Sequence, residues 1–119
     1  MNEEELKRRT KQFALRVIRL MDALPQTRTA QVIGNQLLRS ATSVAANYRA
    51  ACRARSQADF VNKMGLVEEE ADESHFWLEL VVEANLLPMT SVQDLIREAN
   101  ELTAIFVSSR KTAKGKPKI

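Results

Sequence analysis

The one histidine of the chain stands in a run of carboxylates with the spacing of a metal-binding helix face. Four side chains recur there at intervals of four, three and four residues, on one side of a helix: Glu68, Asp72, His75 and Glu79. Asp72 and His75 have the spacing of the Glu-x-x-His element of di-iron bundles. That centre needs two such elements and carboxylates from two further helices, but residues 28–55 contain no acid. We therefore expect no metal or other cofactor, and expect the carboxylates to pair with arginines or lysines.

A second polar set could serve a nucleophile. Ser40, Ser43 and Asn47 share one helix side, but only His75 could supply the base that a serine nucleophile requires. An interhelical hydrogen-bond network is the better interpretation. Cys52, at the core edge, is interpreted as a small buried side chain. The sequence also contains no phosphate-binding glycine loop, so the chain is predicted not to be an enzyme.

The elements that carry these residues are predicted to be helices. Glycine and proline occupy only three positions each among 119 residues, which leaves few chain breaks. Apolar residues recur at alternating steps of three and four over about 3–24, 29–55, 56–85 and from 91 onward. This spacing favours left-handed, coiled-coil-like packing, and short connections favour antiparallel neighbours. The sequence predicts an all-α, antiparallel up-down-up-down four-helix bundle.

The bundle is expected to occupy residues 1–110, with a basic flexible tail over 111–119. The longest stretches without a charged residue are ten positions long, whereas a membrane-spanning helix needs roughly 20 apolar residues. The single cysteine suits a reducing compartment. We expect a cytoplasmic protein without a membrane segment.

Charge is distributed unevenly behind the small net value of +3. Residues 28–55 carry five bases and no acid, whereas residues 59–83 carry eight acids and one base. The five bases are the candidate nucleic-acid contacts: Arg28, Arg39, Arg49, Arg53 and Arg55. At about 100° per residue, the first four lie opposite the expected core of one helix. This stripe is either an ordinary solvated face or a surface for phosphates.

The third expected helix is apolar on two sides. Phe76, Leu80 and Leu87 lie opposite its core seam, with Trp77 beside them. A loop around Pro88 could cover part of this surface. We favour a subunit interface over these four residues, because exposed aromatic patches tend to mark protein contacts.

Two segments resemble a known bacterial family. They are RSATSVAANYRAACRARSQADFVNKM, residues 39–64, and EADESHFWLELV, residues 70–81. Both resemble the 23S rRNA intervening-sequence proteins, which are related to the accessory variability proteins of diversity-generating retroelements. The resemblance implies a four-helix bundle assembled as a homopentamer, without enzymatic activity. In retroelement relatives it implies a basic surface that binds nucleic acid and docks a reverse transcriptase.

Two functional hypotheses follow. The first is a homo-oligomer that offers its arginines to RNA or DNA, with the tail lysines extending the positive surface. The second is a protein-interaction scaffold without a nucleic-acid role. In that case the arginines of residues 28–55 meet acids of the third helix from a neighbouring subunit.

Overall fold

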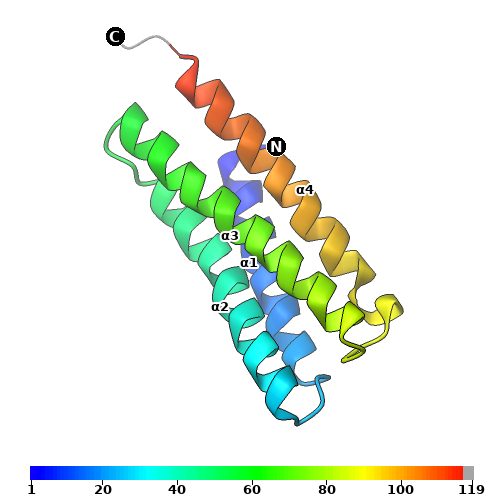
Figure 1. The fold of residues 1–119 in the computed structure, drawn as a ribbon. Helices are drawn as coiled ribbons and strands as arrows, with labels where there is room; N and C mark the ends of the chain where they lie inside the picture. Colours follow the sequence, from blue (N-terminus) through cyan, green and yellow to red (C-terminus); the bar gives the residue numbers. More distant parts are fainter. Residues whose placement is uncertain (117–119) are drawn as a thin grey trace.

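The computed structural model describes residues 1–116, which form four helices and no strand. The helices are α1 (Glu3–Met21), α2 (Arg28–Ala51), α3 (Gln57–Glu83) and α4 (Met89–Lys114). They lie lengthwise beside one another, and the chain reverses direction at each short connection (Figure 1). The bundle measures 54 × 20 × 20 Å. This architecture confirms the expected all-α four-helix bundle.

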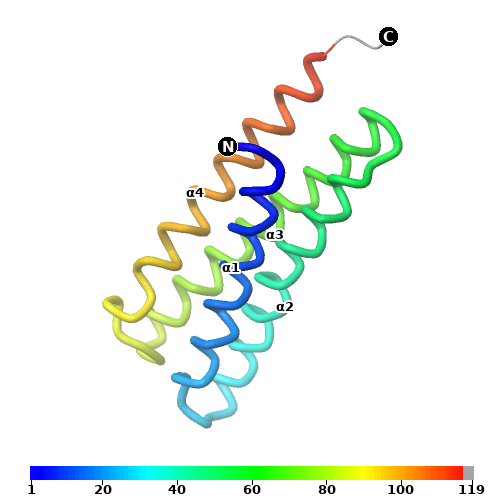
Figure 2. The backbone as a smooth tube through the Cα atoms, turned by 180° about the vertical axis from the view of Figure 1, so that it is seen from behind, coloured from blue at the N-terminus to red at the C-terminus, as the bar shows by residue number. Residues whose placement is uncertain are grey.

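The helices pack in a ring in which each touches its two neighbours. Within the described chain, α1 and α3 are not direct neighbours, and neither are α2 and α4. The least extensive helix–helix contact is between α1 and α4. There the Arg9 guanidinium forms ion pairs with Glu98 and Glu101, at 2.7 Å each. Seen from behind, α1 lies in front, between α4 and α2 (Figure 2). The outer sides of α1 and α3 therefore belong to opposite corners of the bundle.

The core is formed by the apolar seams. Val17, Leu37, Leu78 and Phe106 come from four different helices and have no exposed surface. The ring of Tyr48 stacks on that of Phe106, with 5.9 Å between centroids. Seam residues at three- and four-residue steps thus face one shared interior.

The connection between α2 and α3 is fixed by a capping pair. The Ser56 hydroxyl accepts a hydrogen bond from the Asp59 N–H at 3.0 Å, and the Asp59 carboxylate accepts from the Arg55 N–H at 3.3 Å. The backbone of Ser56 is extended, so one helix cannot run through it. Helix α2 ends at Ala51, not near Arg55 as expected, and both Arg53 and Arg55 belong to the connection.

The other helix ends differ from the expected boundaries by a few residues. Asn85, with φ of 58°, ends α3, and the Leu86 N–H bonds to the Val81 carbonyl at 3.0 Å. Helix α4 continues to Lys114 and buries Ala113, so residues 111–114 are helical where a flexible tail was expected. Positions 117–119 of that tail lie outside the described residues. Within residues 1–116, no helix is long and apolar enough to cross a membrane.

Candidate functional site

Three of the four spaced residues of the acidic run on α3 have a polar side-chain partner: Glu68, His75 and Glu79. Glu68 pairs with Arg110 of α4, at 2.7 Å between Oε2 and Nε, and Glu79 lies 3.1 Å from Nδ1 of His75. Asp72 is exposed. Residues 1–116 contain no group of three or more His, Cys, Asp or Glu side chains arranged for a metal ion. The prediction that these carboxylates pair with bases is confirmed at Glu68.

Two buried serines connect α2 to α3. The Ser74 hydroxyl lies 3.0 Å from the Ser40 hydroxyl and 2.8 Å from the Glu70 carbonyl, and Ser40 donates to the Leu37 carbonyl at 3.1 Å. Neither serine has exposed surface. The expected interhelical network therefore exists at Ser40. It holds the helices together and engages the hydroxyls of both Ser40 and Ser74.

The half-buried thiol of Cys52 is poorly suited to nucleophilic chemistry. Burial raises the pKa of Cys52, and burial next to Cys52 raises the pKa of Tyr48. A raised thiol pKa reduces the thiolate fraction at neutral pH. Cys52 packs against the core but is only partly buried, whereas a buried side chain was expected.

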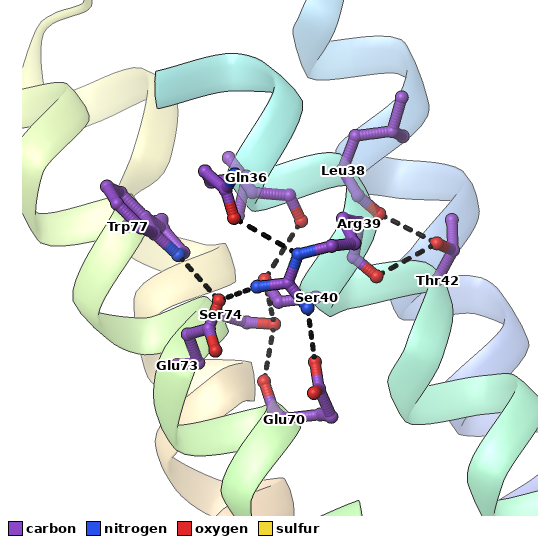
Figure 3. A network of polar contacts seen from close by, with 10 residues as sticks. Gln36, Leu38, Arg39, Ser40, Thr42, Glu70, Glu73, Ser74 and Trp77 are labelled. Atoms are coloured by element: carbon purple, nitrogen blue, oxygen red, sulfur yellow. Dashed lines mark hydrogen bonds and ion pairs between the residues drawn. The ribbon is translucent and has the colours of Figure 1, made fainter. Parts of the chain in front are cut away.

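Arg39 is occupied within its own chain. Its guanidinium pairs with Glu70 at 3.3 Å and with Glu73, and its Nε donates to Gln36 at 3.0 Å. The same Glu73 oxygen accepts a hydrogen bond from the Trp77 indole at 2.9 Å (Figure 3). We call these five side chains the Arg39 clamp: Gln36, Arg39, Glu70, Glu73 and Trp77. The clamp fastens α2 to α3, so the arginine expected to meet phosphate is already partnered by two carboxylates.

The other four candidate arginines are exposed but lie apart. Arg28 begins α2 at one end of the bundle, whereas Arg49 stands in the last turn of the same helix. Arg53 and Arg55 follow in the connection to α3. The candidates therefore do not form a single helix stripe. Three of them gather at one end.

The C-terminal end of α4 lies at the same end of the bundle as Arg49, Arg53 and Arg55. The Gln57 side-chain amide donates to the Ala113 and Lys116 carbonyls, the latter at 2.9 Å. This contact sets the start of α3 beside the last turn of α4, as Figure 1 also shows. We define the basic end by six exposed bases: Arg49, Arg53, Arg55, Lys111, Lys114 and Lys116. Among the described residues, none of the six forms an ion pair with a carboxylate.

The lysines of the basic end were expected to lie in a separate flexible tail. The missed feature was Gln57, whose side chain brings α4 to the α2–α3 connection. A lone glutamine carries no distinctive sequence signal, so only the fold brings the two basic segments together.

The four expected interface residues divide into two groups. Trp77 and Leu87 are half-buried and pack against the core. Phe76 is 50% exposed and contacts Trp77 edge to face, with 5.0 Å between ring centroids. Leu80 is half-buried. Leu66, which the sequence reasoning did not select, is 52% exposed on the same helix.

Comparison with known proteins extends the resemblance seen in two segments. Residues 2–108 match the model of a family described as 23S rRNA-intervening sequence protein. None of the curated proteins compared with the chain matches it. A crystal structure of a protein with unknown function, from the S23 ribosomal protein family of Bacteroides thetaiotaomicron VPI-5482, is 32% identical. The match covers 89% of this chain and 98% of that one, with a TM-score of 0.83.

Proposed function

The chain belongs to the 23S rRNA-intervening sequence protein family, and from this premise we propose that it is a non-enzymatic homo-oligomer that binds nucleic acid through its basic end. One observation carries the proposal. Six exposed bases from two distant segments gather there without a carboxylate partner in the described residues. The phosphate backbone of RNA or DNA is the polyanion that such a cluster favours.

The arginines contribute unequally in this proposal. Arg49, Arg53 and Arg55 contact phosphates, and the lysines at the end of α4 extend the positive surface. Arg39 contributes less, because Glu70 and Glu73 already neutralise it. Arg28 lies about 30 Å from Arg49 along α2, at 1.5 Å per residue. Phosphate contacts carry little sequence information, so binding is weakly specific and strongly salt-dependent.

The assembly belongs to the same proposal. We take the oligomer to be a cytoplasmic homopentamer, the state implied by the family resemblance, built from antiparallel bundles with left-handed packing. The nucleic acid would be a ribosomal-RNA intervening sequence or a retroelement nucleic acid, in the second case alongside a reverse transcriptase. Both settings supply a polyanion for the same surface.

An alternative function is a protein-interaction scaffold that binds no nucleic acid. In it, the arginines of α2 meet acids of α3 from a neighbouring subunit. The Arg39 clamp is an example of this charge pairing within one chain. Replacing Arg39, Arg49 and Arg53 by alanine separates the two functions. Loss of nucleic-acid binding with assembly intact supports the first, and dissociation of the oligomer supports the scaffold.

The direct test compares two variants that lose the same charge. Arg53→Ala/Arg55→Ala removes two bases from the basic end, and Arg28→Ala/Arg97→Ala removes two exposed bases elsewhere. Fluorescence anisotropy with mixed RNA and DNA oligonucleotides, from low to physiological salt, measures affinity. We expect the first variant to weaken binding at least tenfold and the second to change it little. No binding by the wild type at low salt, or equal losses in both variants, would reject the proposal.

A further inference from the structure

The outward side of α3 combines unpaired acids with exposed apolar side chains. Five exposed residues form this surface, which we call the acidic face: Leu66, Glu69, Asp72, Phe76 and Glu83. No ion pair within residues 1–116 involves its three carboxylates. The one lysine of the helix, Lys63, is held by Asp59 at 2.8 Å. Apolar side chains framed by charge of one sign are typical of a docking surface.

The outward side of α1 has the opposite charge. Four exposed residues form what we call the basic face: Arg8, Lys11, Ile18 and Arg19. Its three bases form no ion pair with a described carboxylate. Ile18 is 44% exposed between them. Exposed acids, Glu4 and Asp22, stand at the two ends of this side, and its middle combines basic charge with an apolar centre.

We infer that the acidic face of one copy of this chain docks on the basic face of α1 in a second copy. The acidic face cannot pair with itself without placing carboxylates opposite carboxylates, which is unfavourable. The basic face offers complementary charge and an apolar partner for Phe76. Lys11 precedes Ile18 by seven residues, just as Glu69 precedes Phe76. Because α1 and α3 run the same way along the bundle (Figure 1), both pairs can meet in one parallel register.

Helix α2 is the other basic candidate, and it fits less well. Arg39, near the middle of α2, is occupied by the clamp. The remaining helical bases, Arg28 and Arg49, stand at the two ends of α2. The exposed positions between them include Gln31, Val32 and Asn35, which carry no charge. The acids of α3 therefore find their charge partners on α1.

This pairing determines the type of assembly. The two faces are different surfaces on opposite corners of the bundle, so each copy uses one face toward each neighbour. Such a contact is heterologous and repeats around a ring when the successive rotations close. The inference rests on the proposed homo-oligomer and identifies its contact surfaces. It does not involve the basic end.

Charge-reversal variants of the full chain test the pairing. The first variant replaces Arg8, Lys11 and Arg19 with glutamate. The second replaces Glu69, Asp72 and Glu83 with lysine. A control, Gln93→Glu/Arg97→Glu/Asn100→Glu, places acids on exposed positions of α4. Light scattering gives the mass of each protein, alone and in an equimolar mixture of the first two, and circular dichroism checks helix content.

The expected result is specific to a heterologous contact. The wild type and the control share a mass several times 13.4 kDa, and each face variant alone has the mass of one chain. In the mixture, the intact acidic face of the first variant meets the intact basic face of the second. The two reversed faces are also complementary to each other, so the variants assemble in alternation into complexes of two or more chains. Combining all six reversals in one chain restores assembly. A face variant that keeps the wild-type mass, or a mixture that stays monomeric, overturns the inference.

Nucleic-acid affinity measured on the same samples separates this inference from the proposed function. Assembly in the expected pattern without binding of RNA or DNA removes the nucleic-acid role and leaves the interface standing. Binding of nucleic acid by an oligomer that survives both face variants removes the interface alone. A wild type of 13.4 kDa overturns the interface and the proposed assembly together.

Discussion

Arg39 of α2 and Glu73 of α3 form an ion pair whose carboxylate oxygen is shared with the indole of Trp77. One oxygen of Glu73 thus accepts hydrogen bonds from both Arg39 and Trp77. Glu70 pairs with the same guanidinium. The arginine and glutamate side chains are 46% and 36% exposed, so solvent screens the charges. The clamp fixes the orientation of Trp77 and contributes modestly to stability.

Breaking the clamp is expected to lower the free energy of unfolding by a small, coupled amount. Arg39→Ala and Glu73→Gln should each cost about 0.5–1 kcal/mol, the upper range for partly exposed pairs. The double variant should cost less than the sum, because both changes remove one interaction. Urea unfolding followed by Trp77 fluorescence measures each value. Arg97→Ala, which breaks an exposed pair with Asp94, is the control, and additive losses at Arg39 and Glu73 would contradict the shared contact.

A second prediction concerns the pH dependence of the α3 cap. The hydrogen bond from Lys63, together with that from the Arg55 N–H, lowers the pKa of Asp59 below its ordinary value of 3.8. Because its pKa is lower in the folded state, ionised Asp59 stabilises the fold at pH values above its unfolded-state pKa. This stabilisation is lost as the pH falls through the folded-state pKa. Carboxyl NMR should therefore titrate Asp59 at lower pH than an exposed carboxylate. Lys63→Ala should raise that pKa, and an unchanged titration would refute the assignment.

The heptad seams and the capping pair were sufficient to predict the fold. Ser56 and Asp59 are three residues apart in sequence, and a cap depends only on such local geometry. The stop just after α3, at Asn85, was also predictable from local sequence, since asparagine tolerates a positive φ. Buried positions such as Leu37 and Leu78 follow from helix periodicity alone.

The candidate site was less predictable, because it depends on contacts between distant segments. The ion pairs of Arg39 depend on the register of α2 against α3. This register brings Arg39 to Glu70 and Glu73, which are 31 and 34 positions away in the sequence. The basic end requires Gln57 to meet the α4 terminus, 56 positions away. The angle of about 100° per residue holds only within a continuous helix. Because α2 ends at Ala51, it wrongly placed Arg53 on the outer side of that helix. Charge counts identified the basic segments of the sequence but not which of their bases lack an ion-pair partner among the described residues.

Cys52 is expected to react slowly with thiol reagents. Burial raises its pKa, whereas the neighbouring Tyr48 hydroxyl lowers it by hydrogen bonding. The thiolate is the reactive form, so alkylation at pH 8 should be slower in the folded protein than in urea. Tyr48→Phe removes the hydroxyl and should move the pH–rate profile to higher pH. A shift toward lower pH would show that the hydroxyl does not stabilise the thiolate.

The salt dependence of nucleic-acid binding gives a count of the phosphates contacted by the basic end. Each neutralised phosphate contributes about 0.7 to the slope of log K against log salt for single strands, and about 0.9 for duplex DNA. Arg53→Ala/Arg55→Ala should thus reduce the slope by about 1.4 on single-stranded RNA and about 1.8 on duplex DNA. Arg28→Ala/Arg97→Ala should leave both slopes unchanged, because these bases lie outside the basic end. A weaker affinity with an unchanged slope in the first variant would mean that Arg53 and Arg55 act through the fold, not through phosphate contacts.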